Sequence, residues 1–315
     1  MGRNNYSIAL LGTTFLVLVG GLWFFDHDVE PVEVGAEEVR EIYSKPQLYD
    51  GEIVENLTSL GHSGIPAMIE VFSDGVEFPI VFVDSFAAIG DARATRSILD
   101  YLDSLDLGKD SEDTAVANRA IWAIEKIGDS TATPALSKIF AYEPNHPLIR
   151  LSAAATVASI DSGERSLEAR NVVLNYYETR NDYYLSMGKG FEESDMIRAL
   201  IALDDQESTA ILREFLTLNP APGLAIPIIN HIAENYHPEN QEILRKLAFT
   251  NLSEYPVIQF EALVSSLPQS NERPSKEVIA KLKEFAKLTP NSVEYSEQIS
   301  ARAISILESI DSKNK

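Results

Sequence analysis

The chain has 315 residues, of which 45% are apolar, enough for a sizeable core in one extended domain or two ordinary ones. Its 48 acidic and 26 basic side chains give a formal net charge of −22. No Lys/Arg stripe interrupts this acidity, so we expect no nucleic-acid partner. The absence of cysteine excludes disulfides, thiolate metal sites and cysteine nucleophiles.

The N-terminal 25 residues carry a candidate membrane anchor. Residues 7–25 contain no charged side chain, and a helix needs about 20 apolar residues to cross a bilayer core. Arg3 precedes this run and Asp26 follows it, so the positive-inside rule predicts a cytoplasmic N-terminus. We therefore expect a single-pass protein of a bacterial inner membrane, with its C-terminal part in the periplasm.

A cleaved signal peptide is the alternative interpretation of residues 1–25. Gly20 and Gly21 are small residues that could follow a shorter apolar segment, and cleavage would leave a secreted periplasmic binding protein. Residues 26–35 are acidic and contain one Pro and one Gly, which predicts a short extended linker under either interpretation.

Two later stretches, IGDARATRSILDYL and IGDSTATPALSKIF, share one pattern. In each, an apolar helix ends at a glycine, Gly90 or Gly128, which can adopt the left-handed conformation that closes a helix. Asp91 or Asp129 follows and can cap the next segment through its carboxylate. Pro134 then falls in the first turn of a new helix, where a missing N–H costs little. The pattern predicts joints between successive helix pairs.

Weaker copies of this pattern continue along the chain at a spacing that suits two helices and two turns. The fold class we expect is therefore all-α, an α-solenoid of stacked antiparallel helix pairs behind one N-terminal transmembrane helix. The predicted organisation is an anchor over 1–25, a linker over 26–35, capping helices over 36–60, repeats over 61–311 and a tail over 312–315.

The repeats resemble the HEAT-like repeat family, in the short form related to phycobilisome-lyase proteins. The first-helix consensus of that family is matched by Asp129, Ala132, Pro134, Ala135 and Leu136, and the second-helix consensus by Ile149, Arg150 and Ala153. The resemblance implies an armadillo-type superhelix in which Arg150 bonds the joint between repeats. It also permits a lyase-like or accessory enzyme activity.

The segment 175–194 interrupts the repeat spacing and is rich in aromatic residues. Tyr176, Tyr177, Tyr183 and Tyr184 form a candidate partner-binding surface, because tyrosine is favoured at binding hot spots. The alternative is that these rings pack within an over-long helix pair.

The chain shows no spacing typical of a metal site, a nucleophile elbow or a dinucleotide-binding loop. We therefore expect no cofactor, no metal, no catalytic residue and no small-molecule substrate. The expected function is a non-catalytic, membrane-anchored scaffold or adaptor for protein partners, with a lyase-like or accessory enzyme as the alternative.

Overall fold

The computed structural model describes residues 34–44, 50–108, 111, 113–179, 193–218, 221–234, 237–250, 256–267, 274–288 and 296–312. The predicted anchor and all but the last two residues of the linker lie outside the described residues, as do Tyr183 and Tyr184. Within the described ranges, no helix combines the length and the apolar character needed to cross a bilayer.

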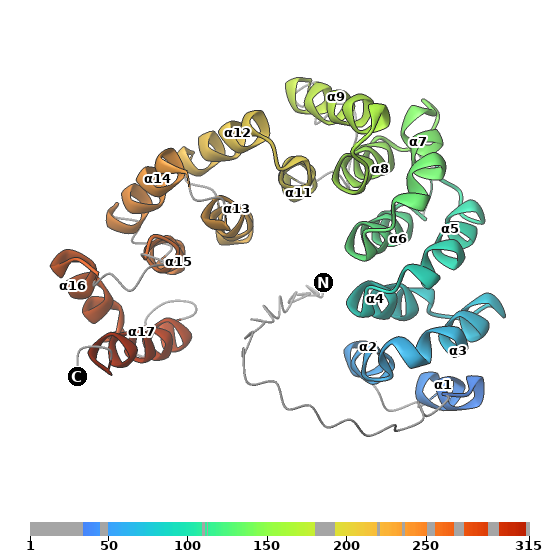
Figure 1. Ribbon diagram of the computed structural model, residues 1–315, viewed down its shortest axis with the longest axis horizontal. Helices are drawn as coiled ribbons and strands as arrows, with labels where there is room; N and C mark the ends of the chain where they lie inside the picture. Colours follow the sequence, from blue (N-terminus) through green and yellow to red (C-terminus); the bar gives the residue numbers. More distant parts are fainter. Residues whose placement is uncertain are drawn as a thin grey trace, which may run out of the picture. The chain divides into compact units, whose positions relative to one another are not determined.

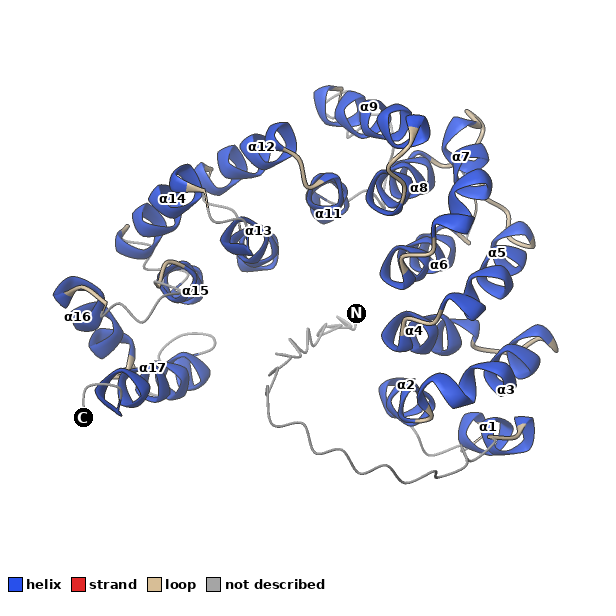
Figure 2. Ribbon diagram, viewed as in Figure 1, coloured by secondary structure: helices blue, strands red, loops and turns tan. Residues whose placement is uncertain are grey.

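The described residues form α-helices and short 3₁₀ turns, which confirms the all-α class (Figure 2). Helices alternate between the first and second members of antiparallel pairs. The first members are α1 (Ala36–Tyr43), α3 (Gly61–Ser73), α5 (Thr95–Asp103), α7 (Thr133–Ala141), α9 (Glu164–Glu178), α12 (Gln206–Thr217), α14 (Pro238–Phe249) and α16 (Lys276–Phe285). The second members are α2 (Asp50–Ser59), α4 (Pro79–Ile89), α6 (Thr114–Ile127), α8 (Pro147–Ile160), α11 (Glu193–Leu203), α13 (Pro222–Glu234), α15 (Pro256–Ser265) and α17 (Ser296–Ser312).

Within the unit 34–315, the two sets of helices form two rows (Figure 1). Each second helix packs on the next one along the chain, from α2 on α4 through to α15 on α17. We call this row the inner row, because it lines the inner side of the array in Figure 1. Helices α1 and α2 pack on α3 and α4 as the later pairs do, so the expected capping helices form the first pair of the array.

The glycine joints show why the chain turns where it does. Gly90 ends α4 with φ 71° and Gly128 ends α6 with φ 73°, the left-handed conformation expected from the sequence. The Asp129 carboxylate then accepts a hydrogen bond from the Thr131 N–H and begins a 3₁₀ turn. Pro134 lies in the first turn of α7, as expected.

Small residues bring the inner-row helices together. Ala117, Ala120 and Ala123 of α6 are fully buried, as are Ala153 and Ala154 of α8. Small side chains let two helix backbones approach closely, and α6 packs directly on α8. The repeated alanine spacing in the sequence therefore marks buried positions on two successive second helices.

Arg150 bonds a joint, but a different one from that implied by the family resemblance. Its Nε donates to the Phe140 carbonyl at 2.9 Å, and its Nη2 lies 2.7 Å from Oε1 of Glu143. Both acceptors belong to the end of α7 and the turn that follows, inside one helix pair rather than between repeats. The reason is position: Arg150 is in the first turn of α8, beside the last carbonyls of α7, which lack partners within their own helix.

Candidate functional site

Three cationic side chains surround one tryptophan on the inner row. Helix α6 places Arg119, Trp122 and Lys126 on one face, because residues three and four positions apart are neighbours on a helix surface. The guanidinium carbon of Arg119 lies 4.6 Å from the centroid of the Trp122 ring, and Nζ of Lys126 lies 5.9 Å from it. Both distances fall in the range of cation–π attraction.

The third cation of this cluster comes from a helix that follows much later in the chain. Arg198 of α11 places its guanidinium carbon 5.4 Å from the same Trp122 ring. Its Nη2 donates to Oε2 of Glu125 at 2.9 Å. Burial lowers the pKa of Arg198, and the charge of Glu125 opposes that shift. We call Arg119, Trp122, Glu125, Lys126 and Arg198 the Trp122 cluster.

Ion pairs between neighbouring inner helices hold this row in place. Arg119 reaches back to α4, where its Nε and Nη2 atoms contact the two carboxylate oxygens of Asp84 at 2.5 and 2.9 Å. Farther along the row, Arg302 of α17 pairs with Glu261 of α15. A two-bond arginine–carboxylate contact fixes orientation as well as distance. Arg119, which stacks on Trp122, is therefore already held in one orientation. This lowers the entropy that the site loses when a partner binds.

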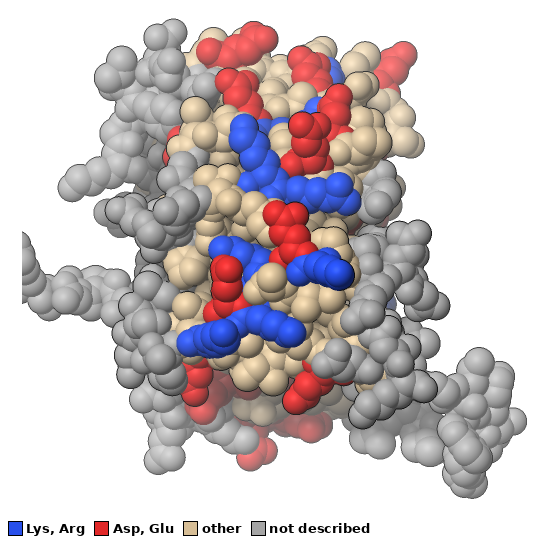
Figure 3. Space-filling model, turned by 90° about the vertical axis from the view of Figure 1, so that its left-hand side faces the viewer, with Lys and Arg blue, Asp and Glu red and all other residues tan. Residues whose placement is uncertain are grey.

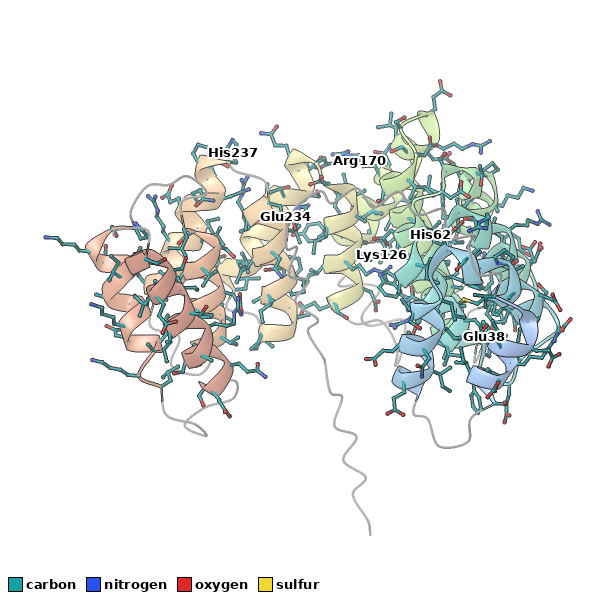
Figure 4. The ribbon with its side chains drawn as sticks, turned by 60° about the horizontal axis from the view of Figure 1, so that its bottom comes forward. Glu38, His62, Lys126, Arg170, Glu234 and His237 are labelled. Carbon is teal, nitrogen blue, oxygen red and sulfur yellow. The ribbon has the colours of Figure 1, made fainter. Side chains whose placement is uncertain are left out.

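Lys126 differs from the two arginines of the cluster. It is exposed in the last turn of α6, and in the described part of the chain it has no carboxylate partner (Figure 4 labels its position). Trp122 beside it is only partly buried. A partly exposed tryptophan flanked by arginines and an unpaired lysine has the composition of a protein-binding hot spot.

The tyrosines expected to bind a partner have other places. Tyr176 is only 2% exposed and belongs to the hydrophobic core. Tyr177 is partly buried, with its ring centroid 6.2 Å from that of Phe215 in α12. The packing alternative therefore describes these two rings, whereas Tyr183 and Tyr184 lie outside the described residues.

The sequence interpretation missed the Trp122 cluster, although part of its signal was present. The stretch RAIWAIEK places Arg119, Trp122 and Lys126 at helical spacing on one face. Arg198 could not be foreseen, because nothing local links α11 to α6. The first helices of the pairs form the outer row. On its helix α16 the charges are mixed and not clustered, with Lys276, Lys281 and Lys283 beside Glu277 and Glu284, and Figure 3 shows both signs interspersed on that side.

Nothing in the described ranges brings together three His, Asp or Glu side chains suited to hold a metal ion. No known family model matches the chain, and no curated protein matches it. Among solved structures, human deoxyhypusine hydroxylase in complex with glycerol is similar, with 16% sequence identity and a TM-score of 0.31. That alignment covers 87% of this chain and 97% of the hydroxylase chain. At this TM-score the similarity carries no argument about activity or ligand.

Proposed function

We propose that this chain is a membrane-anchored, HEAT-like helical-repeat scaffold, and that its inner row binds a protein partner without catalysing a reaction. The observation that carries the proposal is the Trp122 cluster. Tryptophan and arginine are enriched among residues that dominate binding energy, and here they are gathered on helices fixed by ion pairs. A cofactor, a metal and a small-molecule substrate have no role in this function.

Residues 7–25 supply the anchor in this proposal, and the repeat array lies in the periplasm of a bacterium. The intact mass of the mature chain tests this part. A mass that includes residue 7 supports the anchor, whereas a chain that begins near Leu22 shows a cleaved signal and a secreted binding protein.

Site-specific photo-crosslinking in the native cell tests the inner row directly. A photoreactive amino acid replaces Asn118 on the inner row, and its adducts are identified by mass spectrometry with Lys126→Glu and Lys138→Glu as matched variants. Lys126 and Lys138 are both exposed lysines in the last turn of a helix, but Lys138 belongs to α7 in the outer row. We expect one dominant adduct that Lys126→Glu abolishes and Lys138→Glu preserves.

One result would contradict the Trp122 cluster as the binding site, and another would contradict the scaffold function. Equal loss of the adduct in both variants would show that charge anywhere on the array matters, not the Trp122 cluster. An adduct only to small molecules, with the chain abundant and folded, would favour the lyase-like or accessory enzyme instead.

A further inference from the structure

The turns inside the helix pairs expose large apolar side chains. In the described part of the chain, Phe78, Tyr142, Leu218 and Phe249 are all well exposed, with exposed fractions of 53%, 59%, 70% and 39%. Each lies where a first helix gives way to its second helix. Because antiparallel pairs stack in register, these turns share one edge of the array. An edge with repeated exposed apolar groups is a marker of an interaction surface.

The N-terminal part of this edge is built rigidly. The Phe78 backbone N–H donates to the Tyr43 hydroxyl at 2.8 Å, which holds the turn before α4 against α1. The turn after α7 is tied to the neighbouring pair, since the His146 N–H donates to the Leu107 carbonyl at 2.7 Å. Asn145 fixes the same turn from inside, with its Nδ2 bonded to the Ile139 carbonyl at 2.9 Å. Phe78 and Tyr142 are therefore presented on ordered backbone.

Acidic side chains lie between these two aromatic rings. Asp103, the last residue of α5, and Asp106, in the turn that follows, are both exposed, and Glu77 is exposed beside Phe78. We call these three exposed carboxylates the acidic strip. Negative charge between two apolar side chains disfavours an anionic lipid surface and a second acidic copy of the chain, and it attracts cations.

We propose that this edge, made by Glu77, Phe78, Asp103, Asp106 and Tyr142, binds an extended segment of a partner protein. The segment has Lys or Arg residues between two apolar side chains. Packed helices lie about 10 Å apart, so the two pair-to-pair steps from Phe78 to Tyr142 span roughly 20 Å. An extended chain covers this distance in about six residues at about 3.3 Å each. The site is separate from the Trp122 cluster and does not depend on it.

A defined peptide tests the proposal on the full-length chain in non-ionic detergent. The probe is a dye-labelled peptide of sequence Leu-Lys-Arg-Lys-Arg-Lys-Leu, and its control has Ser in place of both Leu. Binding is followed by fluorescence anisotropy at several salt concentrations. We expect Phe78→Ser with Tyr142→Ser to raise Kd about tenfold or more, because two apolar anchors are lost. Leu167→Ser removes a comparably exposed residue of α9 and should leave Kd within about twofold.

The acidic strip has its own matched pair of variants. Glu77→Gln with Asp103→Asn removes two charges from the edge, and Glu164→Gln with Glu168→Gln removes two exposed charges from α9. We expect only the first pair to weaken binding and reduce its salt dependence.

Three outcomes would overturn the proposal. The first is equal binding of the Leu and Ser peptides, or no binding of either, and the second is equal loss of affinity in edge and control variants. The third is a dimer in light scattering that Phe78→Ser with Tyr142→Ser dissociates, because the edge would then join two copies of this chain.

Discussion

The Nη2 atom of Arg198 lies 2.9 Å from Oε2 of Glu125, although 73 residues separate them in the sequence. The two residues belong to α11 and α6, and α8 is the helix packed against both. This ion pair therefore connects second helices that are not nearest neighbours in the row. It also positions the Arg198 guanidinium over the ring of Trp122. The candidate site is therefore complete only where α6 and α11 are held together by the packing of the array.

Replacing Glu125 by Gln should destabilise the array, because it leaves the partly buried guanidinium of Arg198 without the carboxylate that it bonds. We expect a loss of about 1–3 kcal/mol in the free energy of unfolding, measured by urea denaturation followed by circular dichroism. Asp100→Asn removes a carboxylate from the exposed pair with Arg96 and should cost less than about 0.5 kcal/mol. Equal losses of unfolding free energy in the two variants would mean that the pair of Glu125 and Arg198 stabilises the fold no more than an exposed ion pair does.

Gly128→Val should lower the stability of the fold through backbone strain alone. A Cβ at Gly128 would meet no atom within 4 Å beyond the glycine and its chain neighbours, but the φ of +73° strains any β-branched residue. We expect a loss of about 1–2 kcal/mol or more, visible as a lower thermal midpoint. Gly128→Asn should recover much of it, because Asn tolerates this conformation. A midpoint unchanged by Val would show that the joint relaxes without a left-handed residue.

The joints show what could be predicted from the sequence and what could not. At Gly90 and Gly128 the glycine itself predicts a left-handed helix end, so the boundaries of the nearby helices could be predicted from the sequence. At the end of α11 the same geometry falls on Asp204, with φ 45°, where no glycine marks it. The Trp122 cluster was hidden for another reason: Arg198 and Glu125 lie 73 residues apart, and no local spacing encodes their contact.

Arg150→Ala tests the joint inside the α7–α8 pair. The Arg150 side chain is 12% exposed, and its removal leaves the Phe140 carbonyl without this donor. We expect a loss of about 1–3 kcal/mol in unfolding free energy by urea denaturation. Arg96→Ala, at an arginine that is 81% exposed, should change stability by less than about 0.5 kcal/mol. A negligible effect of Arg150→Ala would mean that water replaces its bonds at no cost.

Asp205 should make part of the stability dependent on pH. Burial acts to raise its pKa, but the Ser208 N–H and the Arg170 guanidinium outweigh burial, so the folded-state pKa is lowered. A lowered pKa means that the stabilisation is present above the unfolded value of about 3.9 and is lost as pH falls through the folded value. Asp205→Asn keeps an acceptor for the helix cap but cannot titrate. We expect the variant to be about 1–2 kcal/mol less stable than the wild type at pH 7, with the gap shrinking steadily below about pH 4.

Urea denaturation of both proteins between pH 7 and pH 2.5 measures that gap. Asp205→Ala provides the control, because it also removes the cap bond to Ser208. Its free energy of unfolding should lie about 1 kcal/mol below that of Asp205→Asn at every pH. A wild-type advantage over Asp205→Asn that stays constant across this range would contradict the titration of Asp205. The hydrogen bond from Arg170 would then stabilise the fold equally with a neutral acceptor, and the charge of Asp205 would contribute nothing.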